Sequence, residues 1–164
     1  LCLKHRLVPF VKFVGIHCRG YDFAGWDYHK NIFTWMPMAA PQYDQAIAAL
    51  ITDLSGLGIL DDVLVLAFGE FGRTPIINED AGRDHWPKAG TALMAGGGIP
   101  GGGIHGETDS RGAEIKSKPV SPENFLATIF NIFGFGPETY TTDSVGRRHF
   151  IVPEGSQVIH DLFT

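Results

Sequence analysis

Two continuous apolar segments flank a segment with helical periodicity, and this order constrains the fold more than any other feature. Residues 7–16 (LVPFVKFVGI) and 63–68 (VLVLAF) are rich in β-branched and aromatic side chains, which is typical of strands buried on both faces. From Pro41, apolar side chains recur at helical spacing, and Gly56 and Gly58 follow, so we expect a helix between Pro41 and these glycines. Strand, helix and buried strand in this order predict a right-handed crossover in a parallel sheet.

Two further elements complete the predicted architecture. Residues 91–96 (TALMAG) form a third short strand, and Ser121 with Pro122 behind it starts a second helix that Gly134 ends,. The apolar face of this helix comprises Leu126, Ile129, Phe130 and Phe133. Because no internal repeat or linker divides the chain, we expect a single α/β domain over residues 1–164, a mostly parallel sheet with flanking helices,.

Composition excludes several classes of protein. With 164 residues, 44% hydrophobic and 19% charged, the chain suits an ordinary globular domain rather than a disordered one,. The net charge of −5, with both signs scattered, excludes the basic stripe of a nucleic-acid-binding protein,. No apolar stretch reaches the roughly 18 residues that a membrane span needs,. The chain begins with Leu1 rather than Met, so we expect a fragment or processed piece, and Cys2 and Cys18 leave the compartment and the disulfide state open,.

Six polar side chains lie in the loops at the ends of the three predicted strands. Asp27 and His29 follow the first strand, Glu70 and Arg73 follow the second, and Asp84 and His85 precede the third. Because ligands of open parallel sheets gather at the carboxyl ends of the strands, we expect these groups to meet at one edge. Carboxylates and imidazoles are ligands for a divalent metal, Zn²⁺ or Mn²⁺ first and Ca²⁺ or Mg²⁺ as alternatives, and two metals could share such a set.

A metal site of this kind suits the hydrolysis of a small anionic ester. Divalent metals polarise ester oxygens and lower the pKa of bound water, and Arg73 could grip an anionic oxygen of a phosphate or sulfate ester,. A structural alternative stays open for each residue. Asp84 and His85 could be a loop pair bonded to the backbone, and Arg73 could serve only as the ion-pair partner of Glu70,.

Two other features of the sequence bear on function. Residues 96–101 (GGGIPG) match the dinucleotide-binding fingerprint of a nucleotide-dependent oxidoreductase, but that fingerprint must open a helix, and Pro100 with the glycines behind it does not favour one,. A flexible flap is the favoured interpretation of this segment. His105 could swing toward the same edge, although a solvent-exposed loop histidine is the default.

Several segments resemble, in order and spacing, a known family. GWDYHKN, DDVLVLAFGEFGRTP, GRDHWP, LMAGGGIPGG, GETD and NFLATIF are similar to the bacterial family catalogued as domain of unknown function 1501, over nearly the whole chain. That family is grouped with the alkaline-phosphatase and sulfatase-like superfamily, so the resemblance implies a doubly wound α/β core with a mono- or dinuclear metal site. It also implies that longer members often carry an export signal.

The resemblance implies roles for particular residues. Asp27 and His29 look like the Asp and His that the superfamily places after one strand, and His85 is similar to a later metal-binding histidine, with Asp84 as a ligand or as the carboxylate that orients it. Glu70 occupies the first of two positions where the superfamily has an acidic pair or Asp-His. The second position is Phe71, which cannot bind a metal. A second metal site is therefore in doubt.

Two hypotheses follow. No superfamily nucleophile lies in these residues, so the chain resembles the C-terminal part of a family member whose N-terminal half completes the fold. The first hypothesis is a metal-dependent hydrolase of phosphate or sulfate esters. The second is a non-catalytic binding or surface protein that kept the fold and lost turnover. The substrate, the metal, the nucleophile and the oligomeric state stay open.

Overall fold

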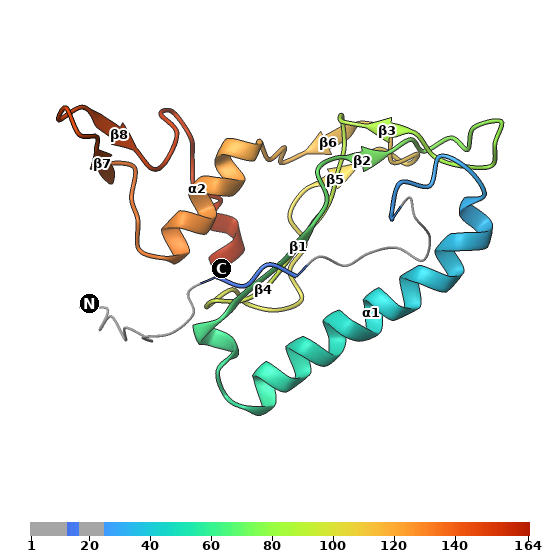
Figure 1. The fold of residues 1–164 in the computed structure, drawn as a ribbon, viewed down its shortest axis with the longest axis horizontal. Coiled ribbons are helices and arrows are strands. Elements are labelled where there is room, and N and C mark those ends of the chain that lie inside the picture. Colours follow the sequence, from blue (N-terminus) through green and yellow to red (C-terminus); the bar gives the residue numbers. More distant parts are fainter. Residues whose placement is uncertain (1–12, 17–24) are drawn as a thin grey trace.

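The computed structural model describes residues 13–16 and 25–164. Along the chain the elements are α1 (Ile32–Gly56), the 3-10 helix η1 (Leu60–Asp62), β1 (Leu64–Phe68), β2 (Gly72–Arg73), β3 (His85–Trp86), β4 (Ala92–Gly96), β5 (Glu107–Thr108), β6 (Ile115–Ser117), α2 (Pro122–Ile132), β7 (Tyr140–Thr142), β8 (Arg148–Phe150) and the 3-10 helix η2 (His160–Phe163) (Figure 1). Cys2, Cys18 and most of the predicted first strand lie outside the described residues.

The prediction of a mostly parallel sheet is wrong. β1 pairs with β4 in antiparallel register, with Leu64 opposite Gly96 and Phe68 opposite Ala92. Every strand pair of the described residues is an antiparallel two-stranded ribbon: β1–β4, β2–β3, β5–β6 and β7–β8. The part of the predicted first strand that is described, residues 13–16, has no regular structure.

The connection between β1 and β4 explains the antiparallel pairing. After β1 the chain forms β2, turns and returns along β3. Strand β4 therefore starts beside the last residue of β1 and runs in the opposite direction. A parallel pair would need a crossover that returns the chain to the starting end of β1. Continuous apolar sequence indicates burial on both faces, and it does not distinguish a parallel pair from an antiparallel one.

Helix α1 begins earlier than predicted, at Ile32 rather than at Pro41, and ends at Gly56 as expected. Its start is held by a distant loop, since the amide of Asn31 donates to the carbonyl of Asp80 at 3.0 Å and that of Ile32 to the carbonyl of Ala81 at 2.9 Å. These contacts satisfy amides that helix starts otherwise leave without partners. The side chain of Asn31 makes no capping hydrogen bond, so the tertiary contact sets this boundary.

Helix α2 has the predicted ends but not the predicted buried face. The Ser121 hydroxyl accepts the amide of Asn124 at 3.2 Å, and Gly134 follows the helix at φ 82°. Leu126 and Phe133 of the predicted apolar face are exposed, whereas Thr128 is fully buried. Thr128 tolerates burial because its hydroxyl donates to the carbonyl of Asn124 and accepts the amide of Ile159,.

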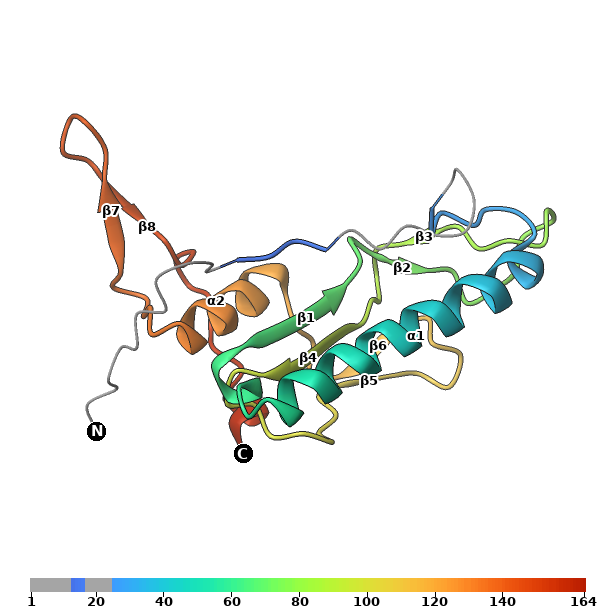
Figure 2. The ribbon, with the colours of Figure 1, turned by 60° about the horizontal axis from the view of Figure 1, so that its bottom comes forward.

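The buried apolar side chains of the described part are few: Tyr28, Ile32, Ala39, Val65, Ala127 and Val152. Helix α1 runs alongside the β1–β4 pair, and the β7–β8 ribbon projects from the body beyond α2 (Figures 1 and 2). Among the helices of the described residues, none combines the length and the apolar character needed to cross a membrane. The β2–β3 ribbon lies at the N-terminal end of α1, and this junction carries the polar cluster described next.

Candidate metal centre

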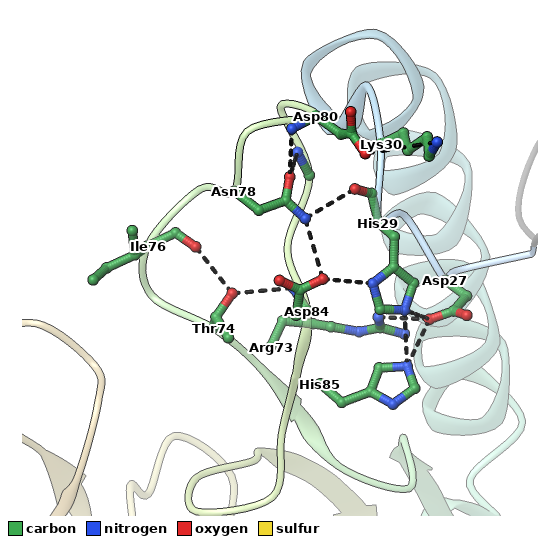
Figure 3. Close-up of polar contacts among 11 residues, drawn as sticks. Asp27, His29, Lys30, Arg73, Thr74, Ile76, Asn78, Asp80, Asp84 and His85 are labelled. Carbon is green, nitrogen blue, oxygen red and sulfur yellow. Dashed lines mark hydrogen bonds and ion pairs between the residues drawn. The ribbon is translucent and has the colours of Figure 1, made fainter.

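Three potential ligand atoms converge where the β2–β3 ribbon meets the start of α1 (Figure 3). Nε2 of His29 lies 3.1 Å from Oδ1 of Asp27 and 3.1 Å from Nε2 of His85. Nε2 of His85 lies 3.0 Å from the same oxygen of Asp27. The three side chains thus offer one carboxylate oxygen and two imidazole nitrogens that could hold a single metal ion,.

The β2–β3 ribbon and the loop that joins its strands bring these side chains together. Arg73 is the direct cross-strand partner of His85, so both project from the same face of the ribbon,. The loop then runs against the segment of Asp27 and His29, where the amide of Arg83 donates to the carbonyl of Tyr28 at 3.0 Å. Gly82 allows this approach, because a Cβ there would lie 2.0 Å from the backbone carbonyl oxygen of His29.

The orientation of His29 is set by Asp84. Nδ1 of His29 lies 2.7 Å from Oδ1 of Asp84, and a carboxylate oxygen can only accept, so Nδ1 carries the proton,. In the neutral ring, Nε2 then presents its lone pair to Asp27 and His85. Bonding to His29, and secondarily to Asn78, lowers the pKa of Asp84. A carboxylate behind a histidine in this way is the usual support of a metal-binding imidazole.

Asp27 is the anionic member of the cluster. The bond from His85, and after it the guanidinium of Arg73 held close by, lower the pKa of Asp27 to about 2,. The group is therefore ionised at neutral pH. Its side chain is 47% exposed, so its charge remains accessible to an ion from solvent.

Arg73 lies beside Asp27 without using its full bonding capacity. Nη1 of Arg73 is 2.6 Å from Oδ1 of Asp27. This buried nitrogen nevertheless has no hydrogen-bond partner with good geometry among the described residues, because closeness alone does not align the N–H with the oxygen,. The guanidinium also lies over the ring of Phe71, 5.5 Å from its centroid. Arg73 is thus the ion-pair partner of Asp27, and the alternative pairing with Glu70 is not present among the contacts of the described residues.

Glu70 lies apart from the cluster. Its side chain is exposed and makes no hydrogen bond or ion pair with the described residues. Phe71 packs against His85 instead, with ring centroids 4.1 Å apart. Glu70 and Phe71 lie in the bend between β1 and β2, and of these two side chains it is that of Phe71 that contacts the site. Of the six residues singled out in the sequence, the structure brings together Asp27, His29, Arg73, Asp84 and His85.

Sequence reasoning missed Asn78, which is bonded to both Asp84 and the backbone of His29. The local sequence, NEDAG, signals a turn and nothing more specific,. His105 is not part of the cluster, since its Nδ1 faces Oδ2 of Asp161 at 3.9 Å. Gly96 ends β4, a turn at Gly97 and Gly98 follows, and no helix starts within residues 96–101, so the structural requirement of a dinucleotide fingerprint is not met,.

Comparisons with known proteins give one positive finding. A family model described as "Protein of unknown function (DUF1501)" matches residues 3–163. Neither a curated protein nor a solved structure matches the chain. The family match covers the cluster, both strands of the β2–β3 ribbon and nearly all of the remaining sequence. The chain therefore belongs to the DUF1501 family.

Proposed function

We propose that this protein binds one divalent cation through Asp27, His29 and His85 and serves in the hydrolysis of phosphate or sulfate esters. The observation that carries the proposal is the mutual spacing of the three ligand atoms, 3.0–3.1 Å. Zn²⁺ binds nitrogen and oxygen ligands at about 2.0–2.2 Å, which puts two ligands of a tetrahedral site roughly 3.3 Å apart. The observed triangle needs only a small expansion to accept such an ion.

Electrostatics favours a cation at the same point. With Nδ1 of His29 donating to Asp84, Nε2 of His29 and Oδ1 of Asp27 are two acceptors 3.1 Å apart. Two lone pairs at that distance repel unless a proton or a cation lies between them. A divalent cation would satisfy Asp27, His29 and His85 at once, whereas a single proton on His85 bridges only part of the set.

The ligand set favours particular metals. Two imidazole nitrogens with one carboxylate oxygen suit Zn²⁺ or Mn²⁺, and Ca²⁺ or Mg²⁺, which prefer oxygen ligands, are the weaker alternatives. Three protein ligands leave a position open, as in hydrolytic zinc sites. A cation held there would polarise an ester oxygen and lower the pKa of bound water. The guanidinium of Arg73, ion-paired with Asp27 beside the site, would attract an anionic oxygen of the same ester,.

One hydroxyl close to the metal centre, that of Thr74, could be considered as a nucleophile. The Thr74 hydroxyl lies beside Asp84, but it donates to the carbonyl of Ile76 at 2.9 Å and accepts the amide of Asp84 at 3.1 Å, so it is engaged in the loop (Figure 3). Thr74 is therefore not assigned as the nucleophile. We also propose the grouping with the alkaline-phosphatase and sulfatase-like superfamily, on the metal-binding chemistry of Asp27, His29 and His85.

Titration of the purified protein with Zn²⁺ and Mn²⁺ tests the metal site. We expect one ion per chain for the wild type and loss of binding in His85→Ala. His149→Ala, which removes an imidazole in the exposed β7–β8 ribbon, is the matched control and should bind as the wild type does. Equal binding by the wild type and His85→Ala would refute the site.

Turnover of phosphate and sulfate monoesters by the purified, metal-loaded protein separates catalysis from binding. One observation favours the non-catalytic alternative: Phe71 covers one face of His85 and Glu70 stands away, so the described residues offer ligands for a single ion. Metal binding without turnover of either ester would support that alternative.

A further inference from the structure

The side-chain amide of Asn78 uses its full hydrogen-bonding capacity at the back of the metal centre. Nδ2 of Asn78 donates to the carbonyl of His29 at 3.0 Å and to Oδ1 of Asp84 at 3.1 Å. Oδ1 of Asn78 accepts the amides of Asp80 at 3.1 Å and Gly82 at 2.8 Å. Two donors and one carbonyl with two lone pairs are all that an amide can offer, and each has a partner.

The orientation of this amide follows from its partners. If the nitrogen and oxygen of Asn78 exchanged places, an oxygen would face the carbonyl of His29 and the carboxylate of Asp84, and an NH₂ group would face two backbone N–H groups. All four contacts would then be repulsive, so only one of the two orientations is compatible with the surroundings.

Asn78 therefore holds His29 at two points. One N–H binds the backbone of His29 itself. The other binds the same oxygen of Asp84 that accepts Nδ1 of His29 at 2.7 Å. The Asp84 side chain is 52% exposed and would otherwise be free to rotate into solvent. Asn78 thus restrains the carboxylate that decides which nitrogen of His29 carries the proton.

We propose that Asn78 is a positioning residue of the metal centre, which keeps Nε2 of His29 unprotonated and directed at the cation. The inference rests on the proposed function, since it assigns a role toward the ion bound by Asp27, His29 and His85. Removing a hydrogen-bond partner behind a metal-binding histidine typically weakens metal binding about 10–100-fold. We expect the same range for Asn78.

Asn78→Asp is the sharpest variant. It keeps an oxygen for the amides of Asp80 and Gly82 but places a second oxygen against the carbonyl of His29 and the carboxylate of Asp84. Asn131→Asp makes the same chemical change at an exposed position of α2 and serves as the matched control. We expect the Kd for Zn²⁺ to rise about 10–100-fold in Asn78→Asp and to stay unchanged in Asn131→Asp.

The tautomer of His29 separates positioning from a general loss of structure. Long-range ¹H–¹⁵N NMR of the metal-free protein should show the Nδ1–H form of His29 in the wild type and a mixture of tautomers in Asn78→Asp, with the amide signals of the β5–β6 ribbon unchanged. If Asn78→Asp does not fold, Asn78→Ser, which removes the amide donor without adding charge, decides by the same two measurements.

The outcomes are distinct. Weaker Zn²⁺ binding together with a mixed His29 tautomer supports the inference. Wild-type affinity and an unchanged tautomer in the variant overturn it and leave the proposed function standing. A wild-type protein that binds no Zn²⁺ overturns the proposed function and the positioning role with it, and the wild-type titration alone identifies that result.

Discussion

Arg73 and His85 face each other directly across the β2–β3 ribbon, and both side chains reach the same carboxylate oxygen of Asp27. Direct cross-strand partners project from one face of a ribbon, so the pairing of the strands is what brings these two side chains together. The segments FGRTP and GRDHWP, separated along the chain, therefore form one structural unit that presents a cation and an imidazole to Asp27.

This relationship predicts the acidity of Asp27 in the metal-free protein. Its pKa of about 2 depends first on the bond from His85 and then on Arg73. Removing either partner should raise the pKa of Asp27 toward the ordinary value of 3.8,. Carboxyl ¹³C NMR titration measures the shift, and Arg148→Ala in the distant β7–β8 ribbon is the control. An unchanged Asp27 pKa in both site variants would contradict the described contacts.

The position of Glu70 outside the ligand cluster predicts that its carboxylate is not needed for metal binding. Because Glu70 lies outside the ligand cluster, Glu70→Gln should leave the Kd for Zn²⁺ unchanged. Asp27→Asn removes the anionic ligand and should weaken binding by more than about tenfold. Isothermal titration of the two variants side by side makes the comparison, and loss of binding in Glu70→Gln would mean that the carboxylate moves to the ion.

The close approach of Gly82 to His29 predicts a position that tolerates no side chain. A Cβ at Gly82 would lie 2.0 Å from the carbonyl carbon and oxygen of His29, so Gly82→Ala must push the loop away from that segment. We expect a loss of about 1–3 kcal/mol in the free energy of unfolding, measured with urea, together with weaker Zn²⁺ binding. Gly101→Ala is the control, since nothing lies within 4 Å of its added Cβ. Equal stability of the two variants would argue against the packed loop.

The turn between β5 and β6 predicts a dependence of stability on pH. Backbone N–H donation, first from Ala113, lowers the pKa of Asp109 in the folded protein. A lowered folded pKa contributes stability above the unfolded pKa, near pH 4, and this contribution is lost as the pH falls through the folded pKa. The wild type should therefore exceed Asp109→Asn in its urea midpoint near neutral pH, and the difference should shrink below about pH 4. A constant difference across this range would refute the role of the charge.

Local pattern was sufficient to locate several elements. The apolar runs that became β1 and β4 were predicted within a residue or two, and the Ser121 cap and Gly134 bounded α2 as expected. These features depend on neighbouring residues alone, namely a short run of apolar side chains, a hydroxyl near free amides and a glycine with positive φ,.

The pairing of strands and the helix boundaries that depend on distant residues could not be predicted from local sequence pattern. The same apolar run suits a parallel or an antiparallel neighbour, so the pairing of β1 with β4 had to come from the path of the chain through the β2–β3 ribbon,. The start of α1 at Ile32 depends on carbonyls of Asp80 and Ala81, which no pattern within the helix reveals.

The sequence by itself determined which chemistry is available: carboxylates, imidazoles and a guanidinium in loops next to apolar strands. The tertiary structure alone decided which of these groups meet, separating Glu70 from Asp27, His29 and His85 and recruiting Asn78. The physical reason is the separation along the chain over which each effect acts. Residue type and spacing act over one turn or one strand, whereas a ligand cluster is assembled by strand register and loop contacts between residues more than fifty positions apart.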